Sequence, residues 1–126
     1  MCNYKCLTTQ IFITSANAIS EEGYIVNIDG TGNRIAGSLF VHEKVIFVIG
    51  KNKMESTLEK AIWRAKNIAA PKNAKRLGLK TPCAVHGDKC YNCKSEDRIC
   101  NAMIVHMSKM NDIDMEVILI NEDLGY

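Results

Sequence analysis

Four of the six cysteines in this 126-residue sequence lie within one twenty-residue segment, residues 81–100. They are Cys83, Cys90, Cys93 and Cys100, with the spacing C-x6-C-x2-C-x6-C. Two residues between Cys90 and Cys93 allow both sulfurs to face one point, and the longer gaps allow the outer two to return to it. Four converging thiolates suit zinc or an iron–sulfur cluster. The segment therefore predicts a cysteine-ligated metal site.

The cysteine spacing leaves two other interpretations open. It matches neither the common ferredoxin patterns nor the paired CxxC motifs of a zinc ribbon. A redox-active or reactive thiol pair and a set of reduced structural thiols are therefore alternatives to the metal site. His86 lies inside the segment and is a further candidate ligand, whereas Cys2 and Cys6 lie near the N-terminus and are expected to be incidental.

The motif DGTGNR, residues 29–34, is the second candidate site. It follows a predicted strand and precedes a predicted helix, and its glycines permit backbone angles that other residues avoid. Amides at the start of a helix, with an arginine nearby, can hold a phosphate or a carboxylate. The motif is neither a P-loop nor a dinucleotide-binding loop, and the alternative is a simple turn. The candidate ligand-binding residues are Asp29, Gly30, Gly32, Asn33 and Arg34.

Length and composition predict one domain with one hydrophobic core, since 47% of the 126 residues are hydrophobic. The formal net charge of +2 and the lack of a long basic run argue against nucleic acid as a partner. The N-terminus has no signal-peptide pattern, and no window has the ~20 apolar residues of a transmembrane helix. We therefore expect a cytoplasmic protein with no membrane partner.

Short apolar runs bounded by turn residues predict the strands. The clearest is residues 44–50, KVIFVIG, an uninterrupted apolar run of the kind found in strands that are covered on both faces. The others are residues 9–14, 24–29, 99–107 and 115–120, and the last two are joined either by a hairpin or by a short crossing loop. Because helical patterns alternate with these strands, we expect an α/β layered domain, with a mostly parallel sheet and flanking helices.

Two helices are predicted, over residues 35–40 and 57–70. Ser56 and Glu59 have the spacing of a capping box that would begin the second helix. The side chains expected to pack on the sheet are Leu58, Ile62, Ala65 and Ala69, and those expected to face water are Glu59, Lys60, Arg64 and Lys66. Trp63 is expected to pack. Pro71 should end this helix or bend it into a shorter one over residues 73–77.

The balance of elements leaves one face of the predicted sheet thinly covered. A sheet of about five strands needs helices on both faces, and the pattern contains a single long helix. We therefore expect that the chain forms an oligomer or that a further segment precedes Met1.

Several stretches together resemble the lactate-utilisation (LUD) domain family. They are NAISEEGYIVNIDGTGNR, NIAAPKNAKRLGLKTPC, the cysteine segment that ends in DRICN, and the terminal NEDLGY, in this order. The resemblance spans residues 7–126 and implies a fold like that of ribose-5-phosphate isomerase, glucosamine-6-phosphate deaminase and the coenzyme A transferases. Family members usually carry an N-terminal half before the equivalent of TTQIFIT, so it also implies a single, incomplete domain over residues 1–126.

The resemblance implies two functions. Some family members act in bacterial L-lactate oxidation in complexes with iron–sulfur proteins, which implies an accessory or electron-transfer-linked subunit, either a homo-oligomer or the companion of a lactate-oxidising complex. Iron–sulfur in the cysteine segment would then transfer electrons, whereas zinc would be structural. In the fold relatives, Gly-rich turns after strands bind sugar phosphates or acyl groups. The alternative is therefore an enzyme or ligand-binding protein that takes a phosphorylated or acyl small molecule at residues 29–34.

Overall fold

The computed structural model describes residues 4–126, so that Cys2 lies outside the described residues. The elements in chain order are η1 (Lys5–Thr8), β1 (Ile11–Thr14), β2 (Ala18–Ser20), β3 (Ile25–Asp29), α1 (Asn33–Leu39), β4 (Lys44–Gly50), η2 (Lys51–Lys53), β5 (Met54–Glu55), α2 (Leu58–Arg64), η3 (Ala65–Ala69), α3 (Ala70–Arg76), α4 (Pro82–His86), β6 (Ala102–His106) and β7 (Asp114–Ile120). Among these residues no helix is long and apolar enough to cross a membrane.

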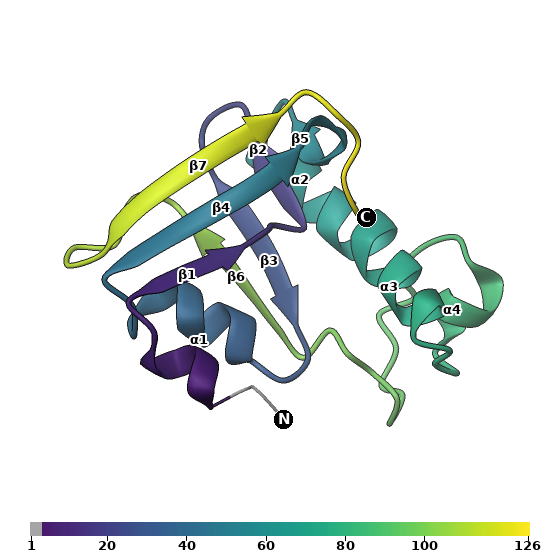
Figure 1. Cartoon of the computed structure of the whole chain (residues 1–126). Helices are drawn as coiled ribbons and strands as arrows, with labels where there is room; N and C mark the ends of the chain where they lie inside the picture. The colour runs from purple at the N-terminus through teal and green to yellow at the C-terminus, as the bar shows by residue number, and fades with distance from the viewer. Residues whose placement is uncertain (1–3) are drawn as a thin grey trace.

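The strands form two sheets that lie face to face (Figure 1). The first has the order β1-β4-β7 and is entirely parallel. The second has the order β5-β2-β3-β6, with β2 and β5 parallel and the other two pairs antiparallel. The predicted α/β class is confirmed. The second sheet was not predicted, because β2 and β5 have only three and two residues and give no periodic signal.

The connection between β6 and β7 is a crossing loop, because the two strands belong to different sheets. The sequence had left a hairpin as the other possibility. Ile113, at the end of this loop, is buried in the core between the sheets. The loop therefore carries the chain from one layer to the other and contributes to their packing.

The main core lies between the two sheets and is built on β4. Val45, Phe47 and Ile49 point into it and are fully buried. Ile46 and Val48 point the other way and are only partly buried, so the outer face of this strand is incompletely covered within this chain. The edge strand β1 leaves Ile13, the neighbour of Ile46, 66% exposed on that face. That another chain covers this face stays a prediction.

The second core lies between the helices and the other face of the mixed sheet (Figure 1). Ala61 and Ala65 of the helical segment pack against Ala18 and Val26 of β2 and β3. Small side chains on both surfaces allow the backbones to approach closely, which brings the residues that follow α2 near the end of β3. Of the side chains predicted to pack, Leu58, Ile62 and Ala65 contact this core, whereas Arg64, predicted to face water, is buried.

The long helix begins one residue later than the capping box predicted. Thr57, not Ser56, is the N-cap, and its hydroxyl accepts a hydrogen bond from the amide of Lys60 at 3.3 Å. A carboxylate also caps this end, but it belongs to Glu22, which accepts from the amide of Leu58 at 2.9 Å. Because Glu22 is 36 residues away in the chain, local spacing could not identify it.

Pro71 does not end the helical segment. Of the two predicted outcomes the structure is nearer to the second, a shorter helix, which spans Ala70–Arg76 rather than residues 73–77. α2, η3 and α3 follow one another without a break, and η3 is a π-helical turn. Pro71 lies in the first turn of α3, directly after this wider turn. A π-helical turn changes the hydrogen-bond register, which accommodates the missing proline N–H at a position where it would interrupt an α-helix.

We expect the buried His106 to make the stability of the fold depend on pH. It is buried, its Nε2 lies 3.3 Å from the carbonyl oxygen of Ser38, and burial lowers its pKa below the ordinary value of 6.5. Below that value the unfolded chain binds a proton that the folded chain does not, so acidification favours unfolding. Urea unfolding of wild type at pH 7.5 and 5.5 should show a loss of stability that His106→Gln reduces. His86→Gln, at an exposed histidine, is the control, and an equal reduction in that variant would contradict this assignment.

Candidate functional site

The predicted ligand-binding turn, residues 29–34, joins β3 to α1. Asp29 Oδ2 accepts hydrogen bonds from the backbone amides of Arg34 at 3.0 Å and Ile35 at 3.1 Å. The helix amides that were expected to hold an anion are therefore already occupied by the Asp29 carboxylate. Gly32 sits at φ +88°, a left-handed angle that favours glycine, and it sets the direction in which the helix leaves the turn.

The same turn lies against the end of the cysteine segment. The side-chain amide of Asn101 donates to the Gly30 carbonyl at 3.1 Å, and the Asn101 backbone amide donates to the Asp29 carbonyl at 3.1 Å. A Cβ atom at Gly30 would come within 2.8 Å of the Ile99 carbonyl oxygen, so only glycine fits there without a shift. The two candidate sites predicted separately from the sequence are thus neighbours in the fold.

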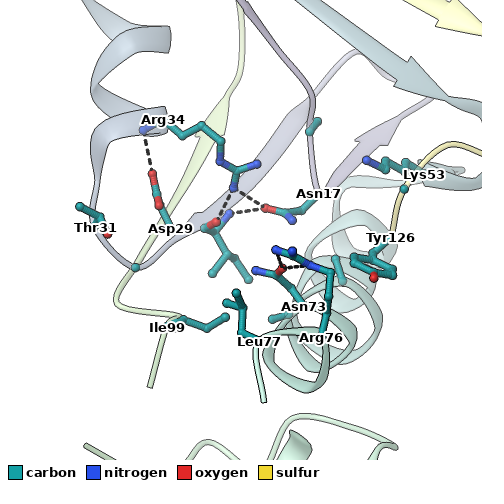
Figure 2. A pocket seen from close by; sticks show the side chains of 16 residues that line it. Asn17, Asp29, Thr31, Arg34, Lys53, Asn73, Arg76, Leu77, Ile99 and Tyr126 are labelled. Atoms are coloured by element: carbon teal, nitrogen blue, oxygen red, sulfur yellow. Dashed lines mark hydrogen bonds between the residues drawn. The ribbon is translucent and has the colours of Figure 1, made fainter. Parts of the chain in front are cut away.

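A cavity of about 490 Å³ opens beside this turn and reaches across to η2 and α3 (Figure 2). Three of the predicted ligand-binding residues, Asp29, Gly30 and Arg34, line it, whereas Gly32 and Asn33 do not. Thr31 of the same turn also lines it, and the polar side chains contributed by other elements are Asn17, Lys53, Asn73, Arg76 and Tyr126. The apolar part of the wall includes Ile28, Leu77 and Ile99.

Arg34 reaches into this cavity from the first turn of α1. Its Nη2 donates to the carbonyl of Ile28 at 2.7 Å and to Oδ1 of Asn17 at 3.4 Å, and these bonds are drawn in Figure 2. Both acceptors are uncharged, so they orient the guanidinium without neutralising it. On the opposite wall, Arg76 donates through Nε and Nη2 to Oδ1 of Asn73, which is also uncharged.

Lys53 brings a third cation to the cavity. Its side chain is only 7% exposed, and Nζ donates to the hydroxyl of Ser15 at 3.1 Å. Burial lowers the pKa of Lys53, and the nearby positive charges of Arg64 and Arg34 lower it further. Because burial and nearby cations disfavour its charged form, Lys53 is a candidate functional residue.

Arg64 lies behind the cavity and fixes two of its walls. The sequence placed Arg64 in water, but it is buried and donates to the Asn17 carbonyl at 2.6 Å and to the Asn52 carbonyl at 2.9 Å. Its side chain therefore ties α2 to the segment before β2 and to η2, which carries Lys53. Burial lowers the pKa of Arg64, while the negative charge of Glu55 raises it.

Carboxylates do not balance the cations of the cavity. Within residues 4–126 the ion pairs are those of Lys44 with Asp114 and Glu116, which lie on the parallel sheet. Arg34, Lys53 and Arg76 thus face one cavity whose wall contains a single acidic side chain, that of Asp29, which is held by backbone amides. The cavity is electropositive and partly lined by apolar side chains, as a site for a small organic anion would be.

The four cysteines of residues 81–100 are not gathered at one point. Cys83 lies in α4, with its sulfur 3.3 Å from the Thr81 hydroxyl. Cys90 and Cys100 line a second, smaller cavity, whereas Cys93 contributes its carbonyl to a hydrogen bond from Arg98. In the described part of the chain, no group of three or more His, Cys, Asp or Glu side chains could hold a metal ion.

The arrangement of the four sulfurs thus does not fit a tetrahedral metal site formed by all four cysteines. Whether the protein binds zinc or an iron–sulfur cluster stays a prediction. His86, the further candidate ligand, has its ring 5.3 Å from that of Tyr91. The Tyr91 hydroxyl in turn donates to Asp88 at 2.7 Å. The polar loop of residues 86–91 is therefore organised by contacts among its own side chains.

Comparison with known proteins identifies the family. The model of the LUD domain matches residues 2–120. The chain belongs to the LUD domain family. No curated protein matches the sequence. Among solved structures, the LUD domain is similar to a crystal structure of a DUF162 family protein from Deinococcus radiodurans, with a TM-score of 0.45 and 13% sequence identity. That match covers 94% of this chain and 58% of the other.

Three important residues of this LUD domain's cavity were missed from the sequence, namely Lys53, Arg76 and Asn17. One available signal was the position of Lys53, three residues after the carboxyl end of the parallel strand β4. Ligands of α/β sheets often bind outside that end of the strands. Asn17 and Arg76 offered no comparable signal, because their roles depend on packing between distant segments.

Proposed function

We propose that this LUD domain binds a small organic anion, carrying a carboxylate or a phosphate, in the cavity beside residues 29–34. The observation that supports the proposal is that Arg34, Lys53 and Arg76 line one cavity and that none of them forms an ion pair within the described chain. A volume of about 490 Å³ lies in the range of small-molecule sites. An anion would neutralise charges that the protein leaves unbalanced.

The three cations suit different parts of such a ligand. Arg34 has a guanidinium oriented by the Ile28 carbonyl and Asn17, and a planar guanidinium pairs with a carboxylate or phosphate through two parallel hydrogen bonds. Lys53 offers a compact charge from a buried stem. Arg76 is exposed and can adjust to the length of the ligand. The apolar side chains Ile28, Leu77 and Ile99 would contact its carbon skeleton.

Asp29 is a structural residue in this proposal rather than a catalytic base. Its Oδ2 accepts two backbone hydrogen bonds, which hold the first turn of α1 against the end of β3. The described cavity thus supports binding, and a reaction would need a further group supplied by the ligand or by another chain. Oxidation of lactate or a related organic acid is compatible with such a role, since the substrate carries a carboxylate.

The accessory, electron-transfer-linked role stays a separate prediction, because it depends on a metal bound by the cysteines. Anaerobic purification followed by metal analysis and visible absorption tests it. Stoichiometric iron with broad thiolate absorption would support electron transfer, and stoichiometric zinc would support a structural metal. A metal-free protein with titratable thiols would contradict both forms of the hypothesis.

A thermal unfolding series tests anion binding and separates the ligand classes. The probes are inorganic phosphate, L-lactate, ribose 5-phosphate and acetyl-coenzyme A, each compared with sodium chloride at equal ionic strength. A ligand present at 100 times its dissociation constant should stabilise the protein by about 2.7 kcal/mol, a rise of roughly 10 °C for a domain of this size. If no anion raises the unfolding temperature beyond its chloride control, the proposal is wrong.

A further inference from the structure

The second cavity, of about 220 Å³, combines two thiols with two cations. Cys90 and Cys100 line it together with Lys66 and Arg98. It adjoins the larger cavity, since Ile28 and Ala70 line both, but its charged and sulfur-containing residues are its own. The cavity brings together residues ten positions apart in the chain, which the CxxC spacing of Cys90 and Cys93 did not suggest.

Both sulfurs in this cavity accept hydrogen bonds. The backbone amide of Asn92 donates to Cys90 Sγ at 3.4 Å, and Nε of Arg98 donates to Cys100 Sγ at 3.2 Å. Arg98 is held in place by the carbonyls of Cys93 at 3.0 Å and Cys100 at 2.9 Å. Cys90 Sγ also donates to Oδ1 of Asn92 at 3.7 Å, whereas Cys100 Sγ faces the fixed positive charge of Arg98. The thiolate is the nucleophilic form of cysteine, and Cys100 is therefore the candidate nucleophile of the pair.

The other two cysteines of the segment, Cys83 and Cys93, do not line the cavity. Cys83 lies beside the neutral hydroxyl of Thr81 in α4. Cys93 accepts a hydrogen bond from Arg98 through its backbone carbonyl, and the charge of Arg98 also acts on its side chain. The four cysteines therefore divide into a pair in a cationic cavity and two that lie outside it.

We propose that Cys90 and Cys100 form a thiol–disulfide exchange site for small disulfides that carry negative charge. Lys66 and Arg98 would attract the anionic groups of such a disulfide into the cavity. This site is separate from the proposed anion-binding function, because it uses none of the three cations of the larger cavity.

The exchange is balanced by the two cysteines and the disulfide alone. The Cys100 thiolate, beside Arg98, attacks one sulfur of the disulfide, whose S–S bond breaks and releases the first small thiolate. The Cys90 thiolate then attacks Cys100 Sγ, breaks the mixed disulfide and releases the second. The protein dithiol is oxidised to a disulfide, the small disulfide is reduced to two thiols, and the two cysteine protons end on those products.

Two disulfide reagents of different charge test the site in the full chain. The test variant keeps Cys90 and Cys100 and carries Cys2→Ser, Cys6→Ser, Cys83→Ser and Cys93→Ser. With the dianionic 5,5′-dithiobis(2-nitrobenzoate), we expect two thiolates released per chain and a product lighter by two hydrogens, without adduct. Arg98→Gln should slow the reaction with this anionic reagent about 10-fold more than it slows the reaction with the neutral 4,4′-dithiodipyridine. A factor of about 10 is the lower end of electrostatic steering.

The matched control keeps Cys83 and Cys93 instead and carries serine at Cys90 and Cys100. It should form stable adducts rather than a protein disulfide, and its preference for the anionic reagent should depend less on Arg98, because Cys83 and Cys93 lie outside the cavity. Circular dichroism of each variant verifies folding, and Lys66→Gln, which leaves the hydrogen bonds of Arg98 in place, should reproduce part of the charge effect. Persistent adducts on Cys90 and Cys100, equal reagent preference in the control, or thiols that react only after removal of a bound metal would each overturn the proposal.

Discussion

Lys53→Met should make the LUD domain more stable in the absence of ligand and should remove its response to anions. Lys53 is buried beside Arg34 and Arg64, and burial together with these charges lowers its pKa. Replacing a desolvated ammonium by an apolar side chain of similar length removes that cost, and we expect a gain of about 1–2 kcal/mol. Phosphate should then raise the unfolding temperature much less than in wild type.

The pH dependence of stability provides an independent readout for Lys53. Because its pKa is lowered from 10.5 in the folded state, the unfolded chain binds more protons between the lowered pKa and 10.5. Wild-type stability should therefore rise with pH in that window, and Lys53→Met should lose this rise. Lys51→Met, an exposed lysine on the same turn η2, is the matched control. An unchanged anion response in Lys53→Met would remove Lys53 from the site.

Arg64→Met should destabilise the fold by about 2–4 kcal/mol. Arg64 is 4% exposed and donates to two backbone carbonyls, those of Asn17 and Asn52, which would be left without this partner. Unsatisfied buried polar groups cost about 1–3 kcal/mol each, although the variant also removes a positive charge near Lys53. Since both carbonyls belong to segments that shape the larger cavity, anion binding should weaken as well.

Urea unfolding measures the effect of Arg64→Met, and the adjacent Trp63→Ala provides the control. Trp63 was expected to pack, but it is 58% exposed, so its truncation should cost less than 1 kcal/mol despite its larger size. Arg64→Lys should recover only part of the stability, because an ammonium cannot reproduce the fork of a guanidinium. A smaller loss in Arg64→Met than in Trp63→Ala would contradict the role assigned to Arg64.

The sequence was informative where structure follows from local pattern. The apolar run of β4 has the predicted bounds, and the small residues Ala65 and Ala69 lie on the buried side of the helix as expected. The buried position of Arg64 was predicted wrongly, and the outward positions of β4 are only partly covered within this chain. Whether a side chain faces a second layer depends on segments far away in the chain, and periodicity does not report them.

The sequence predicted the positions of the candidate sites better than it predicted which residues define their chemistry. Residues 29–34 do lie at a cavity, yet the helix amides are occupied by Asp29, and the unbalanced charges come from Arg34 together with the distant Lys53 and Arg76. Likewise, cysteine spacing emphasised the pair Cys90 and Cys93. The fold instead places Cys90 with Cys100 in one cavity, because the end of the segment is held to the turn by Asn101.

The most direct test of anion binding is a phosphate titration of ¹⁵N-labelled protein followed by amide chemical shifts. The amides that shift in a saturable manner should cluster at Thr31, Arg34, Lys53 and Arg76, around the larger cavity, and Lys53→Met should remove that saturation. The exposed lysines Lys60 and Lys72 report nonspecific charge effects. Saturable shifts confined to such surface positions, or no saturable shifts at all, would contradict the proposed function.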